Sequence, residues 1–243
     1  MNARVRESLP GWVALLAVAA LAWRRTLADA HAMGDAPGTM GMPFVPFLAM
    51  WVPMMAAMML PAITPVATLW TRSIVREPRP AQRLARLLLF AAGYLLVWSA
   101  AGALAFVLMR PVERGLETGM YTSRVAAAVI FALAGLYQLS PLREACLAKC
   151  RSPMTFLGVA TAGPAALRDL RAGAIHGAWC LACCWALMAV LALVGLMNVT
   201  AMVALAVFIF VEKTTRYGVP AGRFAGLAML AAAVFSLVTP SFG

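Results

Sequence analysis

Long stretches without a charged residue constrain this chain more than any other feature. Residues 87–109 and 177–197 contain no Asp, Glu, Lys or Arg. As helices rising 1.5 Å per residue, both stretches would cross the ~30 Å hydrocarbon core of a bilayer. The chain is 63% hydrophobic and only 12% charged, unlike a soluble domain. The sequence therefore predicts an all-α, polytopic transmembrane helical bundle in which residues 1–243 form one integral membrane domain.

Seven spans are expected, or six if the short sixth one is re-entrant. They cover residues 12–28, 44–70, 85–109, 125–141, 174–197, 199–213 and 221–239. The sixth has only 13 uncharged residues after Asn198, so the long side chain of Lys213 must reach the membrane surface. The first also resembles a signal peptide with a cleavage-like triplet at 28–30. Arg24 and Arg25 interrupt its apolar run, which favours a retained helix.

Basic residues predict the orientation of the chain. With the N-terminus in the cytoplasm, the inner segments carry 15 Lys and Arg residues and the outer segments carry five. By the positive-inside rule, residues 142–173 should form a cytoplasmic loop, in which 165–174 could lie along the interface as a helix. The net charge of +11 then reflects topology, and no nucleic-acid partner is expected. With its many Ala, Arg and Pro residues, the chain is expected in a bacterial inner membrane.

Three glycines at the start of the last span form a ridge of small residues. Gly218, Gly222 and Gly226 recur every four residues, which allows another helix to approach closely. Packing within the molecule is favoured over a dimer interface. The sequence does not define the oligomeric state.

The second expected span carries a dense methionine tract. Five of the ten residues from position 50 to position 59 are methionine, and positions 50, 54 and 58 share one helix face. The candidate metal ligands are Met50, Met54, Met55, Met58 and Met59, with His31 as a further candidate upstream. Methionine is also a flexible filler of apolar cores, so packing is the alternative. The density of the tract favours metal handling.

The fifth expected span carries a histidine and three cysteines. Positions 176, 180, 184 and 188 follow one another at helical spacing and share a face. The candidate ligands are His176, Cys180, Cys183, Cys184 and Met188, with Cys146 and Cys150 as a second pair before this span. Thioether, thiolate and imidazole ligands suit Cu(I) best and zinc second. The alternative is that buried cysteine is an inert apolar residue.

The two tracts are expected at the same depth in the membrane. Counted at 1.5 Å per residue from opposite surfaces, the inner half of the methionine tract and the cysteines overlap. If the two spans are neighbours, Met54, Met58, Cys180 and Cys184 could form one site. All five cysteines lie at or near the reducing side in this topology, which favours thiolates over structural disulfides.

The adjacent charged residues Glu212 and Lys213 end the sixth expected span. An ionisable group at membrane depth is a functional candidate, but a helix-end anchor explains this pair equally well. The sequence contains no Ser-His-Asp order, nucleotide-binding glycine loop or paired carboxylates suited to hydrolysis. An enzyme is therefore not the favoured class.

Several of these segments carry a family resemblance. The stretches WVPMMAAMMLPA, YQLSPLREACLAKCRSP and HGAWCLACCWALM, followed by GLMN and VEK, resemble a bacterial family of predicted metal-binding integral membrane proteins, domain of unknown function 2182. The resemblance covers about residues 50–213. It implies a membrane protein that supplies copper to an oxidase such as a tyrosinase. It supports most of the Met and Cys candidates, His176, and Glu212 with Lys213, but not His31.

Copper acquisition or delivery is the leading hypothesis. Cu(I) would pass between exchangeable methionine sites and the thiols, toward a copper-dependent oxidase or another metal-receiving protein. One rival is a membrane redox protein in which Cys180 and Cys183 exchange electrons with a quinone or a partner thiol. A structural assembly subunit without metal is the third hypothesis. Thiol exchange does not need the methionine tract, whereas copper handling uses both tracts.

Overall fold

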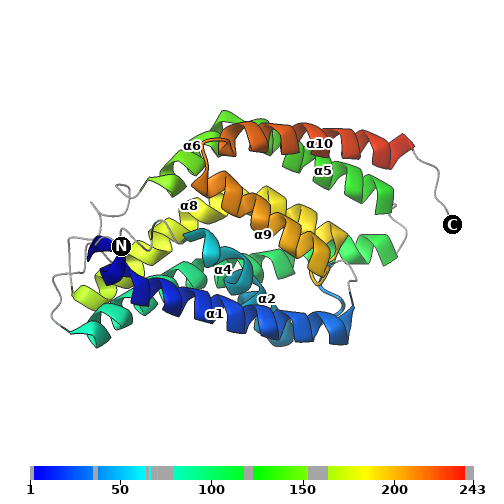
Figure 1. Cartoon of the computed structure of the whole chain (residues 1–243). Coiled ribbons are helices and arrows are strands. Elements are labelled where there is room, and N and C mark those ends of the chain that lie inside the picture. The colour runs from blue at the N-terminus through cyan, green and yellow to red at the C-terminus, as the bar shows by residue number, and fades with distance from the viewer. Residues whose placement is uncertain are drawn as a thin grey trace.

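The protein is helical throughout the part of the chain that its structure describes. A computed structural model describes residues 3–34, 38–63, 66, 70, 79–117, 123–152 and 164–238. These residues form eight α-helices and one short 3-10 helix, η1, and no strand. In chain order the elements are α1 (Ala3–Met33), α2 (Phe44–Met59), η1 (Pro61–Ile63), α4 (Pro80–Glu117), α5 (Ser123–Leu139), α6 (Pro141–Arg151), α8 (Ala165–Val194), α9 (Val199–Thr214) and α10 (Gly218–Val238) (Figure 1).

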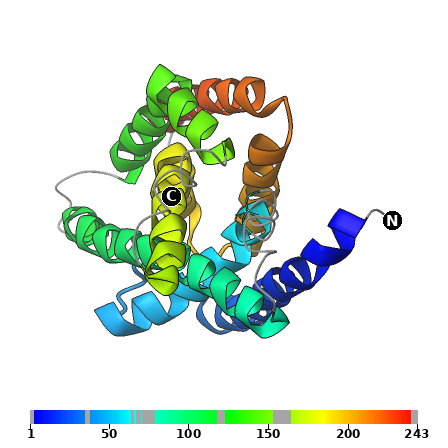
Figure 2. The ribbon, with the colours of Figure 1, turned by 90° about the vertical axis from the view of Figure 1, so that its left-hand side faces the viewer.

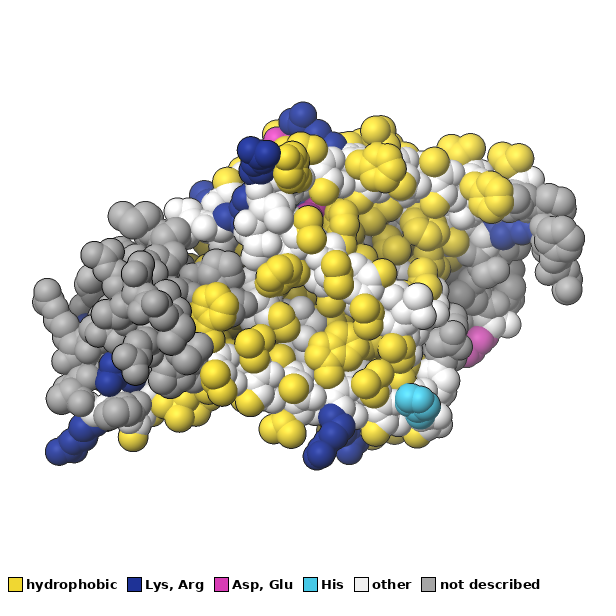
Figure 3. Space-filling view, viewed as in Figure 1, with side chains coloured by type: hydrophobic (Ala, Val, Ile, Leu, Met, Phe, Trp, Pro, Cys, Tyr) yellow, Lys and Arg dark blue, Asp and Glu magenta, His cyan; other side chains and the backbone are white. Residues whose placement is uncertain are grey.

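Four helices are long and apolar enough to cross a membrane. Their apolar segments are Gly11–Met33, Ala81–Gly115, Leu167–Val194 and Gly218–Val238. A fifth span is present if α5 and α6, which meet at a 64° bend, count as one broken span. Hydrophobic side chains cover most of the described surface in Figure 3, and charged ones lie mostly toward its edges. A membrane protein is therefore plausible, but the expected count of seven spans is not confirmed.

Two expected spans are shorter than a bilayer is thick. The helix expected over 44–70 ends at Met59 and gives way to η1, where Pro61 cannot continue the backbone hydrogen-bond pattern. Helix α9 has only 16 residues, or ~24 Å. It begins at Asn198, whose side chain accepts a hydrogen bond from the backbone N–H of Ala201. Most of α2 is buried inside the bundle, whereas α9 buries one face and leaves Val203, Val207 and Phe210 exposed.

The segment expected to form a cytoplasmic loop contains more helix than a loop would. Ser140 caps α6 by accepting a hydrogen bond from the backbone N–H of Arg143, and Pro141 occupies its first turn. Pro164 immediately precedes α8, so residues 165–174 form the first turns of that helix and not a separate interfacial one. The location of this region in the cytoplasm stays a prediction.

Helices α4 and α8 pack closely because glycines remove side chains from their contact. A Cβ atom at Gly173 would lie 1.9 Å from the backbone oxygen of Phe90, and one at Gly93 would lie 2.0 Å from that of Leu170. At the same end of the pair, Arg86 binds the buried carboxylate of Asp169 through two hydrogen bonds. Viewed along the bundle, α8 lies near the middle (Figure 2).

The glycine ridge of α10 packs within the molecule, as favoured from the sequence. Gly226 faces Gly135 and Leu139 of α5, and Gly222 leaves room for the guanidinium group of Arg143. In Figure 1, α5 and α10 lie side by side along the upper edge. This packing brings the start of α10 over the junction of α5 and α6.

Candidate metal site

Cys180 lies at the centre of a group of polar side chains inside the bundle. Its Sγ accepts a hydrogen bond from Lys213 Nζ at 2.7 Å and lies 2.9 Å from the hydroxyl of Tyr94. These residues come from α8, α9 and α4, and all three side chains are buried. A buried ammonium group is costly without an anionic partner. The sulfur of Cys180 is the acidic group that Lys213 contacts.

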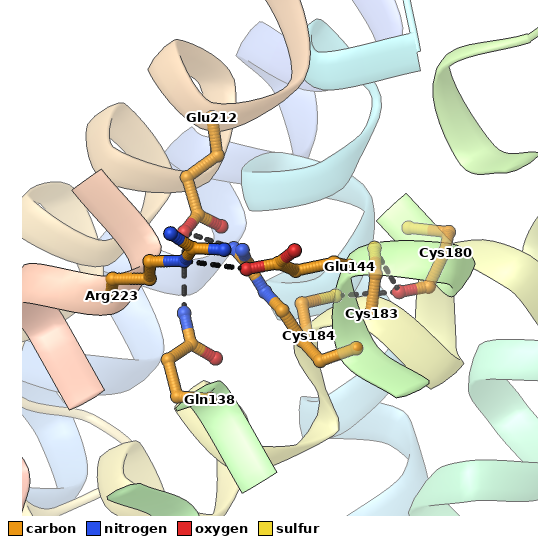
Figure 4. Close-up of polar contacts among 8 residues, drawn as sticks. Gln138, Glu144, Cys180, Cys183, Cys184, Glu212 and Arg223 are labelled. Carbon is orange, nitrogen blue, oxygen red and sulfur yellow. Dashed lines mark hydrogen bonds and ion pairs between the residues drawn. The ribbon is translucent and has the colours of Figure 1, made fainter. Parts of the chain in front are cut away.

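Three further thiols surround Cys180. The Cys150 side chain, from α6, interacts with those of Cys180 and Cys183. The thiols of Cys183 and Cys184 turn back to the backbone oxygen of Cys180, at 3.1 and 2.8 Å (Figure 4). All four cysteines are buried and none is in a disulfide. We call these four residues the thiol cluster.

His176 lies one helical turn before Cys180 and is held by aromatic side chains. Its ring stacks on those of Phe90 and Tyr94, with ring centroids 6.0 and 5.8 Å apart. Both aromatic residues belong to α4, so the closely packed α4 and α8 fix the orientation of the imidazole. His176 is buried and lies beside the thiol cluster, as its position in the sequence predicted.

A small cavity borders the thiol cluster on the side of α9. Its volume is about 20 Å³, and its lining includes Cys150, His176 and Lys213. Ala62 and Val66, which follow α2, line the same cavity. A space of this size accommodates about one water molecule. It therefore has room for a single small ion between a thiol and an imidazole.

A buried ion pair lies next to Lys213 in the sequence and supports this part of α9. The guanidinium group of Arg143, on α6, donates a hydrogen bond to Glu212. Glu212 also accepts one from the side chain of Gln138 at 3.2 Å (Figure 4). The pair is almost completely buried, with side-chain exposures of 0% for Arg143 and 2% for Glu212. The contact links α5, α6 and α9 beside the thiol cluster.

The methionine tract is buried but belongs to a different part of the core. All five of its methionines are inside the bundle: Met50, Met54, Met55, Met58 and Met59. The main packing partners of α2 are α1, α4 and α9, and α8 is not among them. A direct site made of Met54, Met58 and the α8 cysteines is therefore not evident. Ala62 and Val66, which follow the tract in the sequence, line the small cavity together with His176.

The remaining candidates lie outside the thiol cluster. Cys146 is buried on α6, and Met188 is buried one turn beyond Cys184 on α8. His31, at the end of α1, is exposed, and its Nδ1 lies 2.6 Å from the backbone oxygen of Leu27. Lys213 and Glu212 both lie at the site, but Glu212 contacts Arg143 and not a sulfur atom.

The described His, Cys, Asp and Glu side chains do not form a ready-made site of three or more metal ligands. One reason is visible in the thiols of Cys183 and Cys184, which hydrogen-bond to the backbone of their own helix. Rotation about one side-chain bond in each cysteine would release its sulfur for another partner. The candidate ligands are therefore close together, but the cysteine side chains have to rotate before they can surround an ion.

Two residues of the site were not among the candidates chosen from the sequence. Tyr94 is one tyrosine in a long apolar helix, and only the fold places its hydroxyl at Cys180. In the sequence, Arg143 was one of the basic residues that predict the cytoplasmic side, yet its side chain is fully buried. An available signal for Arg143 was its place three residues after Ser140, in the first turn of a helix that carries the cysteine pair.

The helices and the thiol cluster define a class: an α-helical protein, plausibly of the membrane, with sulfur and imidazole groups collected in its interior. Residues 48–236 match the family model described as PpoB2, copper chaperone. The match covers most of the chain, so the protein belongs to this copper chaperone family. Neither a curated protein nor a solved structure matches the chain.

Proposed function

We propose that the protein carries Cu(I) through a bacterial inner membrane and delivers it to a copper-dependent oxidase. The thiol cluster and His176 would hold the ion, and the methionine tract would pass it to or from them. Membership of a copper chaperone family supports copper as the cargo and implies a metal-receiving partner. The softness of thiolate and thioether ligands supports Cu(I) over zinc.

The contact between Lys213 and Cys180 is the observation that carries this proposal. A buried cation 2.7 Å from a buried sulfur stabilises negative charge on that sulfur, and the thiolate is the form of cysteine that binds metal. Three more thiols and an imidazole lie around it. Packing alone does not require a lysine among four cysteines.

The proposal is tested by titrating the purified full-length protein with Cu(I) against a competing Cu(I) chelator. The variant replaces Cys180, Cys183 and Cys184 together by Ser, and the control replaces Cys146, a buried cysteine outside the cluster, by Ser. We expect the triple variant to lose tight binding and the control to retain it. Tight binding that survives the triple replacement would show that the thiols do not form the site.

A thiol redox protein is the second candidate, and the position of Cys150 favours it. Cys150 lies on α6, and its side chain interacts with those of Cys180 and Cys183 on α8, so thiols from two helices meet in the cluster. Counting free thiols before and after copper loading separates the two functions. Delivery of Cu(I) leaves the number of thiols unchanged after a chelator removes the metal, whereas a redox function consumes two thiols for each disulfide formed.

A further inference from the structure

A large apolar cleft lies on the opposite side of α8 from the small cavity. Its volume is about 1230 Å³. Helices α4 and α5 form its walls and α8 forms its floor, because α4 and α5 both pack on α8 but make no extensive contact with each other. Along α8 the cleft extends from Ala178 to Val194, or ~24 Å, which is most of the thickness of a bilayer core.

The lining of the cleft is suited to hydrocarbon. Small residues keep its floor and walls open, among them Ala101 on α4, Ala127 on α5 and Ala189 on α8. Larger apolar side chains such as Trp185 and Leu104 border it and remain substantially exposed. An acyl chain of one membrane leaflet needs only about half of the ~30 Å core. The cleft is long enough for one such chain.

Among the described residues that line the cleft, the charged ones lie at one end. Glu113 and Arg124 line it where α4 ends and α5 begins. The Glu113 carboxylate is already engaged, because it accepts hydrogen bonds from the backbone N–H and the hydroxyl of Thr39. Arg124 is different: its Nη2 is buried and has no hydrogen-bond partner among the described residues. The cationic group there lacks an anion.

We propose that this cleft binds one membrane phospholipid, with its phosphate at Arg124 and an acyl chain along α8. Arg124 lies in the first turn of α5, where the partial positive charge of the helix N-terminus also favours an anion. The phosphate supplies the acceptor that Nη2 lacks, and the chain fills apolar space that would otherwise separate α4 from α5. The bound lipid thereby holds the two helices in place against α8. This proposal does not depend on copper binding.

A transmembrane helix of a partner is the competing occupant, and the shape of the site favours the lipid. A helix with side chains is 10 to 12 Å wide and brings a row of apolar side chains. None of these side chains could accept a hydrogen bond from the guanidinium group at the end of the cleft. A phospholipid combines one anionic group with thin, flexible chains. This matches one cation at the end of an apolar cleft.

The test is native mass spectrometry of the purified, delipidated full-length protein after addition of phosphatidylglycerol. We expect one lipid to remain bound to the natural protein and about tenfold weaker retention in Arg124→Gln, because a charge-assisted hydrogen bond is lost. The matched control is Arg24→Gln, which removes an exposed arginine of α1 outside the cleft. Diacylglycerol, which has the same chains and no phosphate, should bind the natural protein as weakly as phosphatidylglycerol binds Arg124→Gln.

A second variant tests the cleft itself without touching the charge. Ala189→Trp fills the middle of the floor and should also reduce lipid retention, while thermal unfolding in detergent reports whether the variant is folded. Equal lipid retention by Arg124→Gln and Arg24→Gln would overturn the proposal. So would a protein dimer that forms through the cleft and is lost in Ala189→Trp, since a second copy would then be the occupant.

Discussion

Lys213 and Cys180 form a buried pair in which the ammonium nitrogen lies 2.7 Å from the sulfur atom. The two residues are far apart in the sequence and meet because α9 packs on α8. Lysine is one of the residues least often buried without a partner. The pair therefore couples the short helix α9 to the cysteines of the candidate site.

Replacing Lys213 by Met should weaken Cu(I) binding by about tenfold or more. The substitution keeps an apolar side chain of similar length but removes the cation that stabilises negative charge on the Cys180 sulfur. The measurement is competition with a Cu(I) chelator. Lys149→Met is the control, because it removes an ammonium group that lies over the ring of Trp179. Equal affinities for the two variants would mean that the pair has no role in binding.

Replacing Arg143 by Met should destabilise the protein by about 3 to 5 kcal/mol, because Glu212 is left as a buried charge without its partner. Thermal unfolding in detergent measures the effect. The double variant Arg143→Met with Glu212→Leu should recover much of the loss, since it removes both charges. Arg223→Met is the control: its pair with Glu144 is largely exposed, so its loss should cost less than ~1 kcal/mol. A single variant as stable as this control would contradict the assigned role of the buried pair.

Replacing Gly173 by Ala should cost about 3 kcal/mol of stability, because the new Cβ would lie 1.9 Å from the backbone oxygen of Phe90 and force α4 away from α8. Gly177→Ala is a graded comparison on the same helix face. Its closest contact would be 3.0 Å, so a smaller shift is enough. Chemical unfolding of both variants measures the difference, and equal stabilities would show that the helix pair can separate freely.

Periodicity and hydrophobicity predict most of the helices of this protein. Apolar runs predicted the helices α4, α8 and α10. A membrane helix satisfies its own backbone hydrogen bonds, so it can be predicted from its own segment without knowing which helices pack against it. The end of α2 at Met59 was missed because Met and Ala continue the apolar run up to Pro61. A short buried helix such as α2 has the same apolar composition as a membrane span, so hydropathy cannot distinguish the two.

The arrangement of the candidate site was predicted from the sequence only for the part that lies on a single helix. Spacing along one helix brought His176 together with Cys180 and Cys184, since residues four apart share a face. Contacts between helices depend on how the chain folds back. The sequence suggested Met54 and Met58 as neighbours of Cys180 and gave no sign that Lys213 would contact it, as it does in the structure.

The orientation of the chain can be tested with single cysteines at exposed positions. Cys146 and Cys150 are themselves unsuitable, because both are buried. Ala148 is exposed on the same helix, so Ala148→Cys should resist an impermeant thiol reagent in intact cells and react after the membrane is opened. His31→Cys, at the exposed end of α1, should react in intact cells. The reverse pattern would invert the predicted topology.

The last prediction separates a metal path from packing in the methionine tract. Leu and Met have similar volumes, so Met54→Leu with Met58→Leu should cost less than ~1.5 kcal/mol per site and preserve folding, although both side chains are completely buried. Leucine has no donor sulfur. If the tract carries Cu(I), this double variant should be produced normally but fail to support maturation of a copper oxidase in the host. Met229→Leu, a similar change on α10 outside both tracts, should have no effect. Full activity of the double variant, together with loss of activity when the cysteines are replaced, would assign the methionines to packing. The site would then consist of His176 and the thiol cluster.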